Sequence, residues 1–165
     1  MRILLFMVMC LSGINAVADD VADERREAGT SPNMRVHVLR LRPGQDLFSS
    51  LQDYAKRHEI RAGIVLTTVG SLEEARLRLA DRSVETAYKG KMEIVSLVGT
   101  IDAGSAHLHL SVSDGRGRTV GGHLVKGCRV YTTAEVAIGE LADLRFSRET
   151  DPESGYAELK IDPVK

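Results

Sequence analysis

Short segments in which apolar and polar residues alternate make up most of this chain, and a period of two is typical of β-strands. The alternation is clearest in residues 36–41 and 75–79, and residues 63–69 form an apolar, β-branched run that closes at Gly70. Residues 81–91 are polar and are expected to form a loop. Further strands are predicted over residues 92–100, 106–113, 119–125, 128–138 and 156–161, with residues 141–146 as a short strand or a turn.

Residues 46–58 follow a different period, which predicts a long helix. Asp46 suits the positive end of a helix, and the cations that end at His58 suit the negative end. Apolar residues recur there at the spacing of one helical face: Leu47, Phe48, Leu51, Tyr54 and Ala55. One strong helix among many strands with short connections predicts an α+β fold. We expect a mainly antiparallel β-sheet with this long helix and room for further short flanking helices.

The N-terminal residues have the three regions of a secretory signal peptide in order. Arg2 supplies the positive region, residues 3–11 are apolar, and Ala16-Val17-Ala18 fits a cleavage site. The apolar run is shorter than the ~20 residues of a membrane span, and a buried N-terminal strand is the alternative interpretation. The chain thus divides into a signal peptide (1–18), a flexible leader (19–33) and a folded domain (34–165). Cleavage near Ala18 would make the mature protein secreted or periplasmic, with no transmembrane segment.

Composition narrows the classes of function. Lys and Arg number 22 and Asp and Glu 23, so the net charge of −1 gives no overall attraction to nucleic acid or membranes. Aromatic residues make up 4% of the chain, so the core has to be aliphatic. Cleavage near Ala18 would leave Cys128 as the single cysteine, which excludes an internal disulfide. We expect this thiol to be buried, with metal binding or pairing between chains as alternatives.

Three of the five histidines, His107, His109 and His123, lie close together in the sequence. His107 and His109 share one face of a strand because side chains alternate. If the chain turns back at residues 114–118, an antiparallel hairpin places His109 opposite His123, with Cβ atoms roughly 5 Å apart. Three imidazoles on one face are the ligand set of a zinc site with an open fourth position. The alternatives are three solvated rings, or a register slip that sends His123 to the other face.

Other residues near the hairpin bear on this site. Gly121-Gly122 interrupts a strand, which indicates either a close approach by a ligand or a neighbouring subunit, or a bulge. Glu93 is the carboxylate that we would test as a general base, and a surface or subunit-contact glutamate is the alternative. His37 is expected on the polar face of its strand, where it could supply a fourth ligand.

The order of several motifs resembles the PPC domain family, also called DUF296. The resemblance rests on residues 63–72, on Gly90–Thr100, on His107–Ser111 and on Gly121–Leu124, and it covers roughly residues 35–162. It implies an antiparallel sheet with flanking helices and assembly as a homotrimer. It also implies that His107, His109 and His123 are metal ligands, typically for zinc, as in prokaryotic members.

Plant members of that family follow AT-hook segments and bind nuclear DNA, whereas this chain has no Arg-Gly-Arg-Pro hook. The sequence therefore favours a secreted, zinc-binding homotrimer with an unidentified small-molecule ligand or a hydrolytic role, and leaves open whether it is an enzyme. A DNA-binding protein and a non-catalytic trimeric interaction module are the alternatives. Six cations could line a nucleic-acid surface: Arg76, Arg78, Arg116, Arg118, Lys126 and Arg129.

Overall fold

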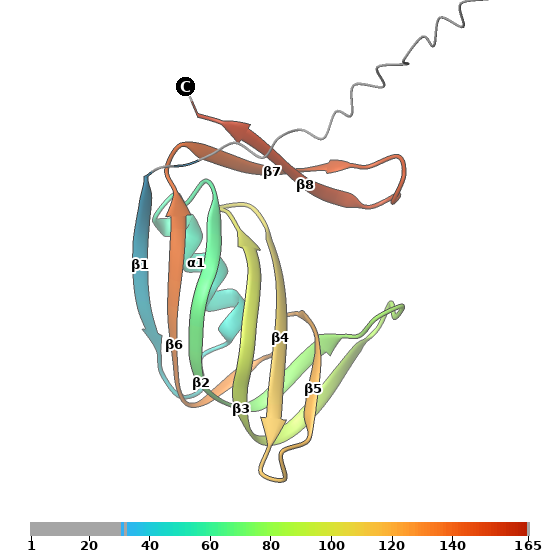
Figure 1. Cartoon of the computed structure of the whole chain (residues 1–165). Coiled ribbons are helices and arrows are strands. Elements are labelled where there is room, and N and C mark those ends of the chain that lie inside the picture. The colour runs from blue at the N-terminus through green and yellow to red at the C-terminus, as the bar shows by residue number, and fades with distance from the viewer. Residues whose placement is uncertain (1–30, 32, 165) are drawn as a thin grey trace, which may run out of the picture.

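The computed structural model describes residue 31 and residues 33–164, and that part of the chain contains eight strands and one helix (Figure 1). In chain order these are β1 (Met34–Leu41), α1 (Leu47–Arg57), β2 (Gly63–Arg78), β3 (Glu85–Ile101), β4 (Ala106–Asp114), β5 (Thr119–Leu124), β6 (Arg129–Leu141), β7 (Leu144–Thr150) and β8 (Ala157–Pro163). The predicted fold class, a mainly antiparallel sheet with one long helix, is confirmed. The proposed signal peptide and nearly all of the leader lie outside the described residues.

Six strands form one antiparallel sheet in the order β1-β6-β2-β3-β4-β5. The sheet also closes on itself, because the end of β2 pairs with β5 through Leu77 opposite Leu124 and Arg78 opposite His123. From Gly63 to Glu74, β2 pairs with β6 instead. The sheet therefore curls at its lower end in Figure 1, where β2, β3, β4 and β5 meet. This closure brings a residue of β2 beside the histidine hairpin.

Helix α1 covers one face of the sheet and buries Leu47, Leu51 and Ala55 against it. Its N-terminus is capped by Asp46, whose carboxylate accepts hydrogen bonds from the backbone N–H of Ser49 at 2.7 Å and of Gly127 at 2.7 Å. The predicted helix and its acidic start are thus confirmed. The largest fully buried side chains are all aliphatic: Leu47, Leu51, Ile60, Leu72, Leu77, Ile101, Leu108, Leu110, Ile138, Val112, Val130 and Val136.

The opposite face of the sheet is open and partly apolar. Val36, Val38, Leu66, Val69 and Val98 are exposed on β1, β2 and β3, with Val38 exposed by 75%. Val36 and Val38 of β1 pair with Gly139 and Ala137 of β6. Val98 of β3 pairs with His109 of β4. We call this surface the open face, and the histidines lie at its margin.

Strand β2 is longer and more continuous than the pattern predicted. The sequence indicated two strands separated at Gly70, but the chain runs extended through this residue. Gly70 has φ +143°, and a Cβ there would lie 2.1 Å from the carbonyl oxygen of Thr133, so glycine lets β6 approach. The prediction of a loop over residues 81–91 was also partly wrong, because β3 begins at Glu85 and pairs with the end of β2.

A separate two-stranded sheet, β7–β8, lies across one end of the main sheet (Figure 1). Leu144 and Phe146 bury themselves with Ala62 in a small second core. A turn at residues 151–155 joins these strands. This hairpin matters because it lies over the start of β4, where the histidine motif begins.

Cys128 is buried, as predicted. Burial raises the pKa of its thiol to about 12. The sulfur accepts a hydrogen bond from the backbone N–H of Arg76 at 3.1 Å. The residue therefore behaves as a small core side chain between β2 and β6.

Candidate metal centre

The hairpin β4–β5 pairs in the register that the turn length predicted. His109 lies opposite His123 and Leu110 opposite Gly122. Leu108 and Leu110 point into the core, so alternation turns His107 and His109 outward onto the open face. The apolar residues thereby fix which way the histidines face, since a slip of one residue would expose both leucines.

The three rings converge on a common point. His107 Nε2 lies 3.2 Å from His123 Nδ1 and 3.3 Å from His109 Nε2. One nitrogen from each ring lies within 4.8 Å of the others. Two nitrogen ligands of a tetrahedral zinc ion are about 3.3 Å apart, from the usual bond length and angle. The cluster is therefore spaced as a three-histidine ligand set.

The electrostatics of the cluster favour neutral rings. Partial burial lowers the pKa of His107, and the charges of Arg148 and His109 lower it further. The pKa of His123 is also lowered, first by burial and then by the charge of Arg78. A neutral imidazole has the free lone pair that a metal requires. Near neutral pH, His107 and His123 can therefore bind a metal without first losing a proton.

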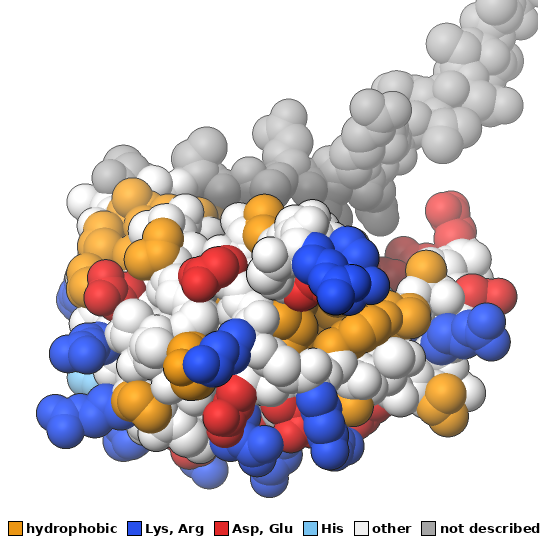
Figure 2. Space-filling view, turned by 90° about the horizontal axis from the view of Figure 1, so that it is seen from below, with side chains coloured by type: hydrophobic (Ala, Val, Ile, Leu, Met, Phe, Trp, Pro, Cys, Tyr) orange, Lys and Arg blue, Asp and Glu red, His pale blue; other side chains and the backbone are white. Residues whose placement is uncertain are grey.

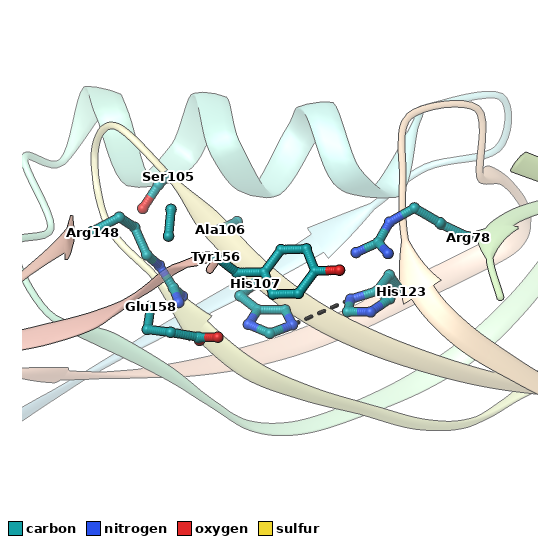
Figure 3. Close-up of a pocket in the computed structure, with 9 residues that line it drawn as sticks. Arg78, Ser105, Ala106, His107, His123, Arg148, Tyr156 and Glu158 are labelled. Carbon is teal, nitrogen blue, oxygen red and sulfur yellow. Dashed lines mark hydrogen bonds between the residues drawn. The ribbon is translucent and has the colours of Figure 1, made fainter. Parts of the chain in front are cut away.

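A cavity of about 480 Å³ opens beside the rings (Figure 3). It is lined by residues of both sheets: Arg78, Ser105, Ala106, His107, His123, Arg148, Tyr156, Ala157 and Glu158. Figure 3 shows Arg148 and Arg78 on opposite sides of His107 and His123. The cluster thus faces a space large enough for a small molecule.

The glycine pair in β5 serves close packing of the chain against itself. A Cβ on Gly122 would lie 2.8 Å from the carbonyl oxygen of Arg78, and one on Gly121 would lie 2.8 Å from Ser111 Oγ. The close neighbours of Gly121 and Gly122 are therefore strands β4 and β2 of the same chain, and not the ligand or neighbouring subunit that the sequence suggested.

Two sequence candidates lie away from the cluster. Glu93 is exposed and pairs with Ser113 near the far end of β4, roughly 13 Å along the strand from His109 at 3.3 Å per residue. The prediction that His37 lies on a polar face was wrong, because its side chain is only 9% exposed. It faces α1 and contacts Glu140 Oε2 at 3.1 Å and the Tyr54 hydroxyl at 3.2 Å.

Sequence reasoning missed Arg148, Tyr156 and Glu158 as cavity residues, and it placed Arg78 only among surface cations. Arg78 reaches the cluster through the β2–β5 pairing, and the others through the β7–β8 hairpin. Neither contact has a local signal, because each joins segments far apart in the chain.

Comparison with known proteins identifies the family to which this chain belongs. Residues 28–142 match the model of the Plants and Prokaryotes Conserved (PCC) domain. The bifunctional protein GlmU of Synechococcus sp. (strain JA-3-3Ab) is 47% identical over 132 residues, which are 80% of this chain and 21% of that protein. The AT-hook motif nuclear-localized protein 27 of Arabidopsis thaliana is 32% identical over 111 residues, 58% of this chain and 35% of that protein. The chain spans about a fifth of the length of its GlmU relatives.

Solved structures agree with this relationship. A hypothetical protein from Salmonella cholerae-suis superposes with a TM-score of 0.81 at 42% identity, covering 82% of this chain and 98% of that one. A metal-containing protein from Archaeoglobus fulgidus superposes with a TM-score of 0.64 at 25% identity, covering 75% of this chain and 91% of that one. The sequence match and the shared fold together show that this chain belongs to the Plants and Prokaryotes Conserved domain family.

Proposed function

We propose that this protein binds one zinc ion through His107, His109 and His123. The observation that carries the proposal is the convergence of three ring nitrogens within 4.8 Å of one another, with two of the three pairs at 3.2 and 3.3 Å. Imidazole nitrogens suit zinc, whereas calcium and magnesium prefer oxygen ligands. The similarity to a protein described as metal-containing supports the same function.

A metal held by three nitrogens keeps a fourth position for water or a ligand. Zinc there would lower the pKa of a bound water towards ~7. Glu158 lines the cavity, whereas Glu93 lies near the far end of β4. A hydrolytic role would therefore use Glu158 as the nearby carboxylate.

Metal analysis of the purified protein tests the zinc proposal. We expect about one zinc per chain after exchange into zinc-free buffer near pH 7, measured by inductively coupled plasma mass spectrometry. The lowered pKa values of His107 and His123 keep those rings neutral at that pH. A protein that holds no zinc after incubation with an equimolar amount of the ion would contradict the proposal.

The homotrimer expected from the family resemblance is part of the proposal, and the open face supports it. Apolar side chains exposed there include Val69, which is 57% exposed and lies opposite Glu135. Exposed apolar side chains that recur on one face of a sheet are found at association sites. The zinc site lies at the margin of the same face, where Val98 pairs with His109.

Replacing Val69 with lysine should dissociate the trimer, because a charge would enter the apolar contact. A lysine there would lie opposite Glu135, so the fold of the single chain should persist. Light scattering after size exclusion should show a threefold mass for the wild type and a smaller mass for Val69→Lys. Val84→Lys is the matched control, since Val84 is 68% exposed in the β2–β3 connection. A wild-type chain that runs as a monomer would disprove the assembly.

We also propose that the mature protein is secreted or periplasmic, on the evidence of the signal-like pattern in residues 1–18. Helix α1 has 11 residues and falls short of the length and apolar content that crossing a bilayer requires. N-terminal sequencing of the exported protein should begin near Asp19; an intact Met1 would argue against cleavage.

DNA binding is the second candidate, and the relationship to an AT-hook protein favours it. The surface gives it less support, because several of the candidate cations are paired with carboxylates. Arg129 pairs with Glu73 and Glu74, and Arg118 pairs with Asp114. On the face drawn in Figure 2, acidic and basic side chains are interspersed. Zinc binding is therefore the function that the geometry supports best.

A further inference from the structure

The cavity beside the histidines is built from two parts of the chain. The main sheet supplies Arg78 together with His107 and His123, and the β7–β8 hairpin supplies Arg148 and Glu158. The hairpin also places the Tyr156 ring between the two arginines, as Figure 3 shows. The space is thus enclosed by a separate element that packs over the start of β4.

Neither of the two arginines that line the cavity is neutralised by a carboxylate in the described part of the chain. Within residues 33–164, neither Arg78 nor Arg148 forms an ion pair with a carboxylate. Arg148 donates a hydrogen bond to Thr100 Oγ1 at 2.9 Å. Strand pairing places the backbone of Arg78 opposite His123, and its side chain lines the cavity. The charges of both arginines therefore remain available to a ligand.

Two guanidinium groups beside a cation site oppose the binding of that cation. Both arginines line the same cavity as His107 and His123, so their charges lie close to the proposed metal position. Glu158 is the single carboxylate among the residues that line the cavity. An anionic ligand would offset this excess of positive charge and would gain from the metal and both arginines together.

We propose that the cavity binds a small molecule with two anionic groups, one on the metal and the other on the guanidinium of Arg148 or Arg78. The inference rests on the proposed zinc site, which supplies the open coordination position. The second group is a carboxylate or a phosphate, because both accept paired hydrogen bonds from a guanidinium. The volume of about 480 Å³ holds a compact dianion of this kind.

Calorimetric titration of the zinc-loaded protein tests the proposal. Malonate represents a dicarboxylate, phosphonoacetate carries a phosphonate in place of one carboxylate, and malonamide is a neutral control of similar shape. We expect both anions to bind and malonamide not to bind. The tighter of the two anions identifies the group that the arginines prefer.

Arg148→Met should weaken anion binding by at least about tenfold, since it removes a charge-assisted hydrogen bond and keeps an unbranched apolar stem in place of the aliphatic part of arginine. Arg145→Met is the matched control. Arg145 lies three residues earlier on β7, on the opposite face of the strand, and does not line the cavity. Arg78→Met provides a second variant from the main sheet, so the result does not depend on the hairpin alone.

Zinc content, measured in each sample before and after titration, separates the two proposals. Full zinc with equal anion affinity in the wild type, Arg148→Met and Arg78→Met would overturn the anion site and leave the zinc site intact. Absent zinc would overturn the zinc site. If the anions then bind without zinc and binding depends on the arginines, the arginines form an anion site by themselves. That result would reject the proposal that one anionic group binds the metal.

Discussion

Replacing His109 with alanine should remove zinc from the protein. His109 supplies one of three converging nitrogens, and its Nε2 lies 3.3 Å from His107 Nε2. Loss of a hydrogen-bonding partner behind a metal ligand already costs 10–100-fold in affinity, so loss of a ligand should cost more than about a hundredfold. Mass spectrometry of the exchanged protein should show a fall from about one zinc per chain to a small fraction of that.

The His109→Ala variant should remain folded, because the side chain is exposed at the surface of β4. His58→Ala is the matched control. That ring stacks on Tyr54 at the end of α1 and is not part of the cluster. Full zinc in His109→Ala, or equal losses in both variants, would count against the three-histidine site.

Replacing Gly99 with alanine should destabilise the protein strongly. Gly99 has φ +135°, and a Cβ there would lie 2.0 Å from the carbonyl oxygen of His107. Backbone strain and steric overlap together should lower the free energy of unfolding by about 2–4 kcal/mol. Because the clash falls on the backbone of His107, zinc affinity should fall as well. Denaturant unfolding followed by circular dichroism measures the first effect.

Gly104→Ala is the comparison for Gly99→Ala. Gly104 lies in the connection before β4, and the nearest atom to an added Cβ is Asp102 Oδ1 at 3.4 Å. Its free energy of unfolding should change by less than about 0.5 kcal/mol, as at other surface positions. Equal denaturant midpoints of unfolding for both variants would show that β3 and β4 can accommodate a side chain between them at Gly99.

The histidine hairpin was predictable because it is local. A short polar turn between two alternating segments fixes the register, and buried Leu108 and Leu110 fix the direction of the rings. The helix was predictable for the same reason, since its stripe and its Asp46 cap lie within a few turns. A pattern that is confined to residues close together in the chain predicts the local structure directly.

The error at His37 has a physical cause. Val36 and Val38 are apolar, which suggested a buried face, but they lie on the open face. Leu39 and Leu41 lie on the other side, where α1 covers them. When both faces of a strand carry apolar residues, alternation alone cannot tell which one is the core.

The cavity could not be predicted from the sequence, because contacts between distant segments of the chain bring its two arginines together. Arg78 is placed by the closure of β2 on β5, and Arg148 by the packing of β7–β8 over the main sheet. Neither the length of the turns nor the periodicity of these segments indicates that β2 pairs with β5 or that β7–β8 packs on the main sheet. The sequence therefore showed the candidate metal ligands, but it did not show the cavity residues that would determine which molecule binds beside them.

The position of the β7–β8 hairpin has a consequence for how such proteins diversify. The family match ends at residue 142, and the hairpin begins at Leu144. The three histidines and the hairpin that lines the cavity are therefore encoded by separate, successive stretches of the gene. Substitutions in the hairpin can change the size and charge of the cavity without altering the histidines.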